Sequence, residues 1–538
     1  MASFINQLGQ LNPQYIRECR GRLKPRSVVA AIVLSLLFQG LLWLSIINSY
    51  SRPDDPSDVL KLCRALSAVI PYALFALGGY YIVDDLTQEA KTGTLNFIRL
   101  SPRPAREILF GKLLGVPALP MVLVAAMLPA HIISGLSAGI SPWLLLSYYL
   151  VVSAGALTVF MLALLVGLGS GNAKLTQQRG VSAIAFAGIN LFSIVPAFTA
   201  WNTAITWQTI PTNTLLFRDW GPTEEDAIHW MFLNISQNAL FAHLFVLGNL
   251  AMIAALIWRT AIRKFRVPQA TLLSRPTSYL ITIYINLAAW GFVFDIPADE
   301  RYYLAAFLYF VNVMLLFTMM FALSPSRQQL LDWTSHRTQA AISSGQPARS
   351  AQAHRGLWQS LVWSDVSPSV GAIAVNFLLS AVLIVPALYL FGQGRTYYNN
   401  EPIPNVTLIA LLFATLVIAL SVLTYATLVQ VIFASKLRAP LVWAVGSAAT
   451  LAIVPVLTLV FLEMAPDDSP MLSAIWTFLG IPMVETVASE IPPLAWIGVI
   501  GQVCFLALLL GRLNQTLKQL KSHSTRTRAE QTLSPTNA

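Results

Sequence analysis

Long apolar runs alternate with short polar segments along almost the whole chain. A membrane-spanning helix needs roughly 20 consecutive, mostly apolar residues to cross about 30 Å of hydrocarbon. Stretches of about this kind without interior charge occur twelve times, which predicts an all-α polytopic membrane protein of about twelve transmembrane helices. The predicted spans are Val28 to Ile47, Leu66 to Val83, Leu113 to Ile133, Trp143 to Leu168, Val181 to Ala200, Leu240 to Trp258, Leu280 to Phe294 (the shortest), Tyr302 to Leu323, Val370 to Phe391, Val406 to Phe433, Leu441 to Leu462 and Leu494 to Leu510.

The polar segments follow a similar outline in the two halves of the chain. Spans two and three are separated by the long segment Asp84 to Lys112, and spans eight and nine by Ser324 to Ser369. We therefore predict two six-helix halves. The predicted divisions are an N-terminal interfacial helix in residues 1–27, a six-helix domain in 28–275, a second six-helix membrane domain in 276–511 and a tail in 512–538.

The distribution of charge predicts the orientation in the membrane. With the amino terminus inside, about 28 of the 34 Lys and Arg residues fall on the inner side, and about 16 of the 24 acidic residues fall outside. Both termini are therefore expected to be cytoplasmic, in a multi-pass protein of the inner (plasma) membrane. The basic residues are scattered over many membrane-flanking segments, which favours contact with anionic membrane lipid and speaks against a nucleic-acid partner.

Composition supports a membrane protein and limits covalent chemistry. The chain is 56% hydrophobic and 11% charged with a mean hydropathy of +0.64, which excludes a soluble multidomain protein of this length. Cys19, Cys63 and Cys504 fall at different predicted depths, too far apart to pair. We expect neither disulfides nor a metal site.

The segment between spans two and three has more pattern than a spacer needs. Leu95, Ile98 and, a little round the helix, Phe97 follow Gly93 and predict a short helix whose apolar face docks into a groove on a partner. Ser101 followed by Pro102 is typical of a helix start.

Two sets of residues in the first half form a family-like pattern. Before span one, the set is Asn12, Pro13, Arg17, Glu18 and Arg20. In the loop after span two, it is Glu89, Gly93, Thr94, Leu95, Ile98, Leu100, Ser101, Pro102, Arg106, Glu107, Gly111 and Lys112. With these residues the first half, roughly Asn12 to Leu280, resembles the permease subunits of type-2 ATP-binding-cassette exporters. The resemblance implies that an interfacial helix leads into span one and that the loop after span two is a coupling helix resting on an ATPase.

The resemblance implies a permease without its own ATPase site, in a complex with a separate ATP-binding subunit that carries ATP and Mg. The glycine-rich stretch from Gly169 to Thr176 lacks the Gly-Lys pair of a phosphate-binding loop. The second half lacks a Glu and Gly-Thr-Leu equivalent before Ser324-Pro325, so either one chain forms a twelve-helix assembly or two copies pair through their first halves. The expected cargo is lipid-like, amphipathic or polymeric.

An alternative function rests on acidic residues in the first external loop. Asp54, Asp55 and Asp58 form the best carboxylate cluster, and membrane glycosyltransferases that use lipid-linked sugars place metal ligands in such a loop. Glu485 and Glu490 are the external residues that could complete that site. The plainer interpretation is a solvated Pro-Asp-Asp-Pro turn.

Two histidines, His131 and His243, fall inside predicted spans. Neither has an acidic neighbour one helical turn away, so we interpret them as packed histidines rather than a proton relay.

Overall fold

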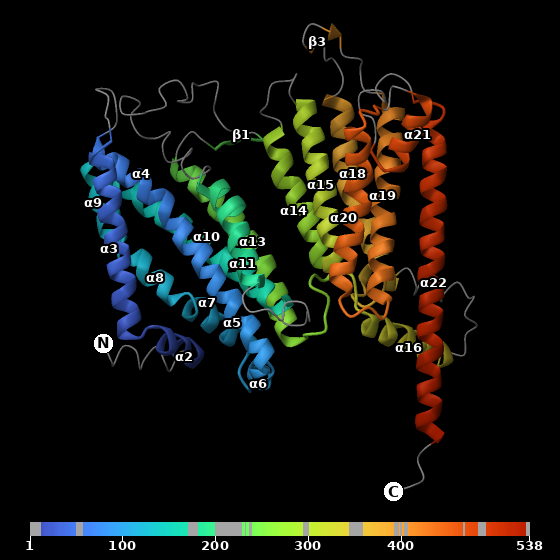
Figure 1. Cartoon of the computed structure of the whole chain (residues 1–538), viewed down its shortest axis with the longest axis horizontal. Coiled ribbons are helices and arrows are strands. Elements are labelled where there is room, and N and C mark those ends of the chain that lie inside the picture. Colours follow the sequence, from blue (N-terminus) through green and yellow to red (C-terminus); the bar gives the residue numbers. More distant parts are fainter. Residues whose placement is uncertain are drawn as a thin grey trace. The chain divides into compact units, whose positions relative to one another are not determined.

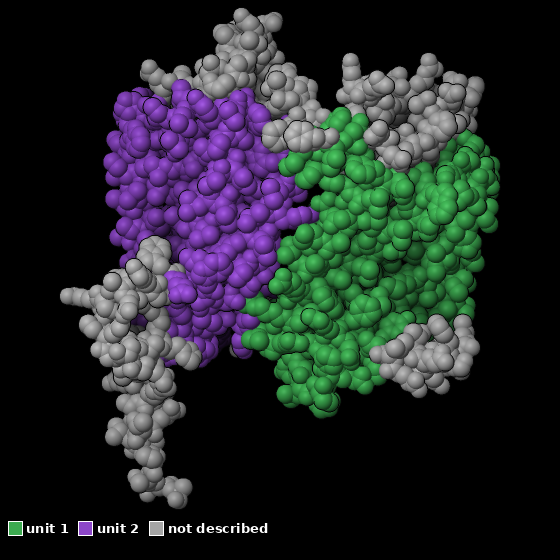
Figure 2. Space-filling model, turned by 180° about the vertical axis from the view of Figure 1, so that it is seen from behind, with its two compact units in different colours: residues 1–268 green, residues 269–538 purple. Residues whose placement is uncertain are grey.

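A computed structural model gives the fold of the chain as two compact units, Met1–Pro268 and Gln269–Ala538, each described here by itself (Figures 1 and 2). The division falls a few residues before the predicted boundary after residue 275. The structure describes residues 12–49, 57–170, 181–199, 229–231, 233–235, 239–293, 301–343, 359–391, 397–398, 401–402, 407–465, 469–481 and 491–533.

Unit 1 is a helix bundle with a short helix at its amino end. Its elements are α2 (Pro13–Arg22), α3 (Pro25–Ile47), α4 (Asp58–Pro71), the π-helix η1 (Tyr72–Leu77), α5 (Gly78–Thr92), α6 (Thr94–Arg99), α7 (Ala105–Gly115), α8 (Ala118–Ala125), α9 (Leu128–Ser137), α10 (Pro142–Ser170), α11 (Val181–Ile189), the π-helix η3 (Asn190–Ile194), a two-stranded ribbon of β1 (His229–Trp230) and β2 (Leu233–Asn234), and α13 (Ala239–Arg266). The main core of the unit gathers α5, α7 and α10, with Leu86, Leu109 and Phe160 fully buried.

Prolines divide the third predicted span into shorter helices but leave the second continuous. The second runs without a break through α4, η1 and α5, with Pro71 at the end of α4. The third is divided into α7, α8 and α9, because Pro117 follows α7 and Pro129 lies in the first turn of α9. The Gln39 side chain donates a hydrogen bond to the Ala126 carbonyl at 3.2 Å, where α8 has ended, so this main-chain acceptor does not stay unpaired in an apolar surrounding.

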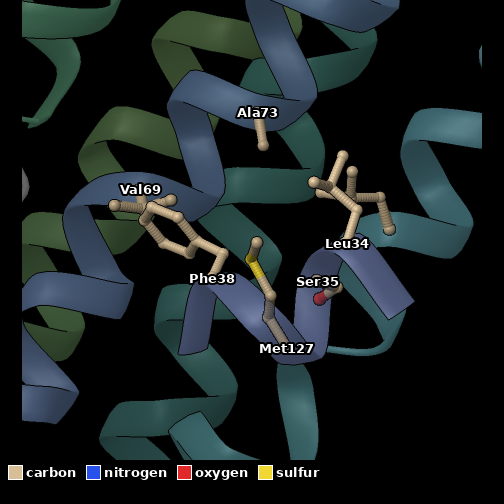
Figure 3. Close-up of a pocket in the computed structure, with 7 residues that line it drawn as sticks. Leu34, Ser35, Phe38, Val69, Ala73 and Met127 are labelled. Carbon is tan, nitrogen blue, oxygen red and sulfur yellow. The ribbon is translucent and has the colours of Figure 1, made fainter. Parts of the chain in front are cut away.

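Helix α3 is the least covered of the unit 1 spans. It packs on α8 and α4, and only a small share of it is buried. An apolar cavity of about 320 Å³ remains between α3 and this part of the bundle (Figure 3).

Unit 2 is also a helix bundle. Its elements are α14 (Arg275–Val293), α15 (Arg301–Leu323), α16 (Arg327–Ser343), α18 (Val370–Phe391), a ribbon of β3 (Tyr397–Tyr398) and β4 (Glu401–Pro402), α19 (Leu408–Ala434), α20 (Pro440–Phe461), α21 (Pro470–Phe478) and α22 (Ala495–Leu533).

A buried polar network joins α14, α15 and α18. Asn286 donates from Nδ2 to Asn312 Oδ1 at 2.8 Å, and Ser380 Oγ donates to the same oxygen at 3.1 Å. One turn away, Thr282 Oγ1 donates to Asn376 Oδ1 at 2.7 Å. Side-chain hydrogen bonds of this kind hold helices together where apolar burial gives little preference between lipid and protein.

Among the described residues, eleven helices or helix runs are long and apolar enough to cross a membrane, as expected of an all-α polytopic membrane protein. Eleven of the twelve predicted spans correspond to them. The exception, Leu280 to Phe294, falls in α14, whose polar side chains lie in the network just described.

Candidate functional site

Helix α2 lies directly against α7 at one end of unit 1. Asn12 caps α2 by accepting a hydrogen bond from the Tyr15 amide at 3.1 Å, and Pro13 occupies the first helical position. The Asn12 side chain also donates to the Glu107 carbonyl at 2.9 Å, at the start of α7. One side chain therefore begins α2 and ties it to α7.

Two glycines let the helices come this close. A Cβ atom on Gly111 would stand 2.8 Å from the Tyr15 amide nitrogen, and one on Gly115 would stand 2.7 Å from the Glu18 Cβ atom. Gly111 was among the predicted site residues, and Gly115 was not. Their spacing of four residues, which places them on one face of α7, was the available signal.

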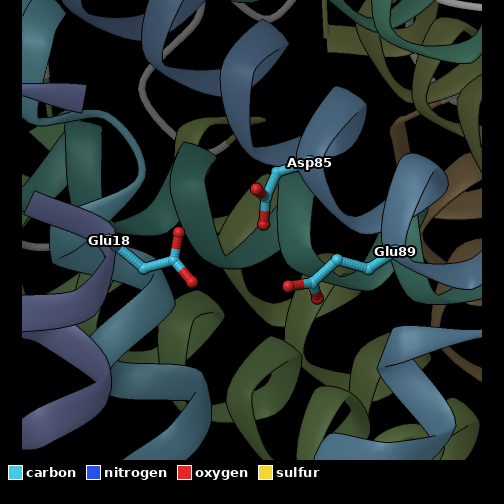
Figure 4. A group of neighbouring side chains, drawn as sticks. All are labelled: Glu18, Asp85 and Glu89. Carbon is cyan, nitrogen blue, oxygen red and sulfur yellow. The ribbon is translucent and has the colours of Figure 1, made fainter. Parts of the chain in front are cut away.

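Lys112, between these glycines, is the centre of an ion network. Its side chain is 1% exposed, and its Nζ atom lies 3.2 Å from Glu18 Oε1, 2.7 Å from Asp85 Oδ2 and 2.8 Å from Glu89 Oε1. The three carboxylates converge from α2 and α5 (Figure 4). Burial by itself would lower the pKa of Lys112, but the three carboxylates outweigh it and raise that pKa.

Two arginines of α2 complete the network. Arg17 donates to Glu89 Oε1 at 3.1 Å, and Arg22 pairs with Asp85. Three cations thus stand against three carboxylates, so the junction of α2, α5 and α7 is electrically balanced. Arg22 and Asp85 were not among the predicted site residues, although Glu18 with Arg22 and Asp85 with Glu89 are each one helical turn apart.

The carboxylates of Glu18, Asp85 and Glu89 approach one another within 4.8 Å, as ligands of a divalent cation do. The Lys112 ammonium stands among them and already supplies a positive charge at hydrogen-bonding distance. The donor set therefore fits an internal ion network better than a metal centre.

Gly93 forms the turn between α5 and α6. Its φ of 79° lies in the left-handed region that glycine adopts without strain, and it both ends α5 and precedes the first residue of α6. Next to it, the hydroxyl groups of Thr92 and Thr94 are 3.0 Å apart.

Of the three side chains predicted to face a partner from α6, two are buried and only Phe97 is exposed. Leu95 and Ile98 are 2% and 7% exposed and belong to the core of unit 1. Phe97 and Leu100 are 81% and 85% exposed. The surface available to a partner is therefore Phe97 and Leu100, because the core takes the other two side chains.

Helix α6 is also fixed to the end of α13. The Arg99 guanidinium lies over the Phe265 ring, 5.6 Å from its centroid, and Arg99 donates to Asn96 Oδ1 at 3.0 Å. Such cation–π contacts contribute about 0.5–1 kcal/mol at partly exposed positions. With Leu95 and Ile98 in the core, α6 is held as part of the bundle.

The start of α7 differs from the prediction. The helix begins at Ala105 rather than at Ser101-Pro102, since Pro104 disfavours helical geometry at Arg103. Arg106 and Glu107 are exposed in its first turn, and Arg20 is exposed on α2. None of these three side chains belongs to the ion network around Lys112.

The residues of the alternative site are mostly not described. Asp54, Asp55, Glu485 and Glu490 lie outside the described residues. Asp58 begins α4, and its Oδ1 atom lies 3.5 Å from Lys61 Nζ.

Both histidines are hydrogen-bonded inside unit 1. His131 lies 2.7 Å from Ser67 Oγ through Nε2 and 2.6 Å from Tyr149 through Nδ1, and His243 Nδ1 lies 2.7 Å from Ser147 Oγ. These contacts agree with packed histidines.

In unit 2, the segment after Ser324-Pro325 leads into α16. Leu330 of α16 is fully buried and packs with Ala434 and Leu520, so α16 packs against the other helices of unit 2.

No family model matches this chain, and no curated protein or solved structure matches it either.

Proposed function

We propose that the chain is the membrane-spanning permease subunit of an ATP-binding-cassette exporter. In this proposal α6 is the coupling helix, which inserts Phe97 and Leu100 into a groove of a separate ATPase subunit. The observation that carries the proposal is the exposure of these two apolar side chains on a short helix whose other apolar face is buried in the core. Short helices with an apolar face are a recurrent form of recognition by a partner groove.

The contacts around α6 support transmission of a movement into the bundle. A force on α6 reaches α5 through Gly93 and α13 through Arg99. It reaches α2 and α7 through the Lys112 network. Because α5 continues through η1 into α4, the force is carried along the whole second span. The charge balance and burial of the network favour motion of these helices as one body.

The two units differ in what they offer an ATPase. Unit 1 presents α6 as a docking helix, whereas α16 of unit 2 packs on α19 and α22. We propose that each chain contacts the ATPase through unit 1. The mass of the purified complex distinguishes one chain per assembly from two copies.

The test is co-purification with surface variants of α6. We expect Phe97→Asp and Leu100→Asp to remove an ATP-binding-cassette subunit that co-purifies with the full-length protein in mild detergent, and to abolish the associated ATP hydrolysis. The control is Val267→Asp, which alters a residue that is 52% exposed just after α13. Retention of the same subunit and activity by both α6 variants would reject the proposal, and so would an equal loss in the control. Leu95→Asp is unsuitable because it places a charge in the core.

A further inference from the structure

An apolar groove runs between α3 and the rest of unit 1. The cavity of about 320 Å³ is continued by a second of about 370 Å³, and Leu34 and Leu123 line both. The side chains of Phe38, Val69 and Met127 gather around the first part (Figure 3). Both walls of the groove are therefore formed by this chain, one by α3 and the other by the helices that face it.

The length of the groove matches one leaflet of a membrane. On α3 it extends from Ser27 to Phe38, which at the rise of an α-helix is about 16 Å. Half of a typical hydrocarbon core is about 15 Å. A chain occupying the groove would thus run from the membrane surface to near the middle of the bilayer.

The end of the groove at Ser27 carries positive charge. Lys24 and Arg26 are exposed and flank Pro25 at the first turn of α3, and neither forms an ion pair within the described residues. The amino end of a helix adds a partial positive charge of its own. Cations at the surface and apolar side chains below them complement a molecule with an anionic head and a hydrocarbon tail.

We propose that this groove binds an anionic phospholipid, with one acyl chain between α3 and helices α4, η1 and α8 and the phosphate at Lys24 and Arg26. The lipid would fill the space between the bundle and α3, a helix that buries only a small share of its surface within unit 1. This inference does not depend on the proposed exporter function, because it concerns a different face of unit 1 from α6.

The test measures lipid retained by the full-length protein. The protein is reconstituted in nanodiscs of phosphatidylglycerol in phosphatidylcholine, extracted in mild detergent and examined by native mass spectrometry. We expect one phosphatidylglycerol to stay bound and Leu34→Trp to displace it by filling the groove. Leu37→Trp is the matched control, since Leu34 and Leu37 are 59% and 60% exposed but Leu37 does not line the groove.

A second pair of variants tests the head group. Lys24→Gln with Arg26→Gln is expected to weaken phosphatidylglycerol binding about 30-fold, while the equally charge-reducing Arg512→Gln with Lys518→Gln leaves it unchanged. Three results would overturn the proposal: equal retention of phosphatidylcholine, equal effects of Leu34→Trp and Leu37→Trp, or a second copy of the chain in place of lipid.

Discussion

At the scale of single residues, Lys112 is the centre of the ion network that joins α2, α5 and α7. Replacing it by methionine keeps the apolar stem but leaves Glu18, Asp85 and Glu89 without the central ammonium. Since removing one partner of a buried ion pair leaves an uncompensated charge, we expect a loss of about 3 kcal/mol in the free energy of unfolding. Thermal unfolding of the purified protein in detergent measures it.

Arg17→Met is the control for this prediction. Arg17 belongs to the same network, but its side chain is 56% exposed, so its loss should cost less than about 1 kcal/mol. Adding Asp85→Asn to Lys112→Met should restore part of the lost stability by balancing the remaining charges. Equal stability of the Lys112 and Arg17 variants would mean that the network is not the stabilising centre described here.

Only part of the ion network could be predicted from the sequence. The pairs Glu18 with Arg22 and Asp85 with Glu89 could be found from their spacing. Their meeting with Lys112 could not, because it depends on α2 crossing α5 and α7, which no local pattern specifies.

At the scale of elements, α2 can pack closely on α7 because Gly111 and Gly115 have no side chains. Gly111→Ala would place a Cβ 2.8 Å from the backbone of α2, which must then shift. We expect a loss of about 1–3 kcal/mol, the usual cost of overpacking, measured by the same thermal unfolding.

Gly21→Ala provides the matched control in α2. A Cβ there has no other atom within 4 Å, and alanine favours a helix over glycine by roughly 0.5–1 kcal/mol. This variant should be neutral or slightly stabilised. If Gly111→Ala were equally neutral, α2 would not be packed on α7 as described.

Helix α6 shows why a face cannot be chosen from periodicity alone. Leu95 and Ile98 are three residues apart, and so are Phe97 and Leu100, which gives the short helix two apolar stripes of equal spacing. The pattern predicts a helix after Gly93, and the structure has one from Thr94 to Arg99. Packing of the bundle decides which stripe is buried.

At the scale of the whole molecule, hydrophobic run length predicted the membrane helices well. The runs are long because a helix, which pairs every main-chain group, needs roughly 20 residues to cross about 30 Å of hydrocarbon. Leu280 to Phe294 is the informative exception. Its helix presents Thr282 and Asn286 to neighbouring helices, so its polarity reflects packing within unit 2.

Photo-crosslinking from position 97 tests most directly whether α6 rests on an ATPase. A photo-reactive phenylalanine derivative replaces Phe97 in the full-length protein in cells, and Val267 in the control. The account predicts that position 97 captures a chain containing a Gly-x-x-x-x-Gly-Lys-Ser/Thr phosphate-binding loop and that position 267 does not. Capture from position 97 of lipid, of another copy of this chain or of a protein without that loop would contradict it.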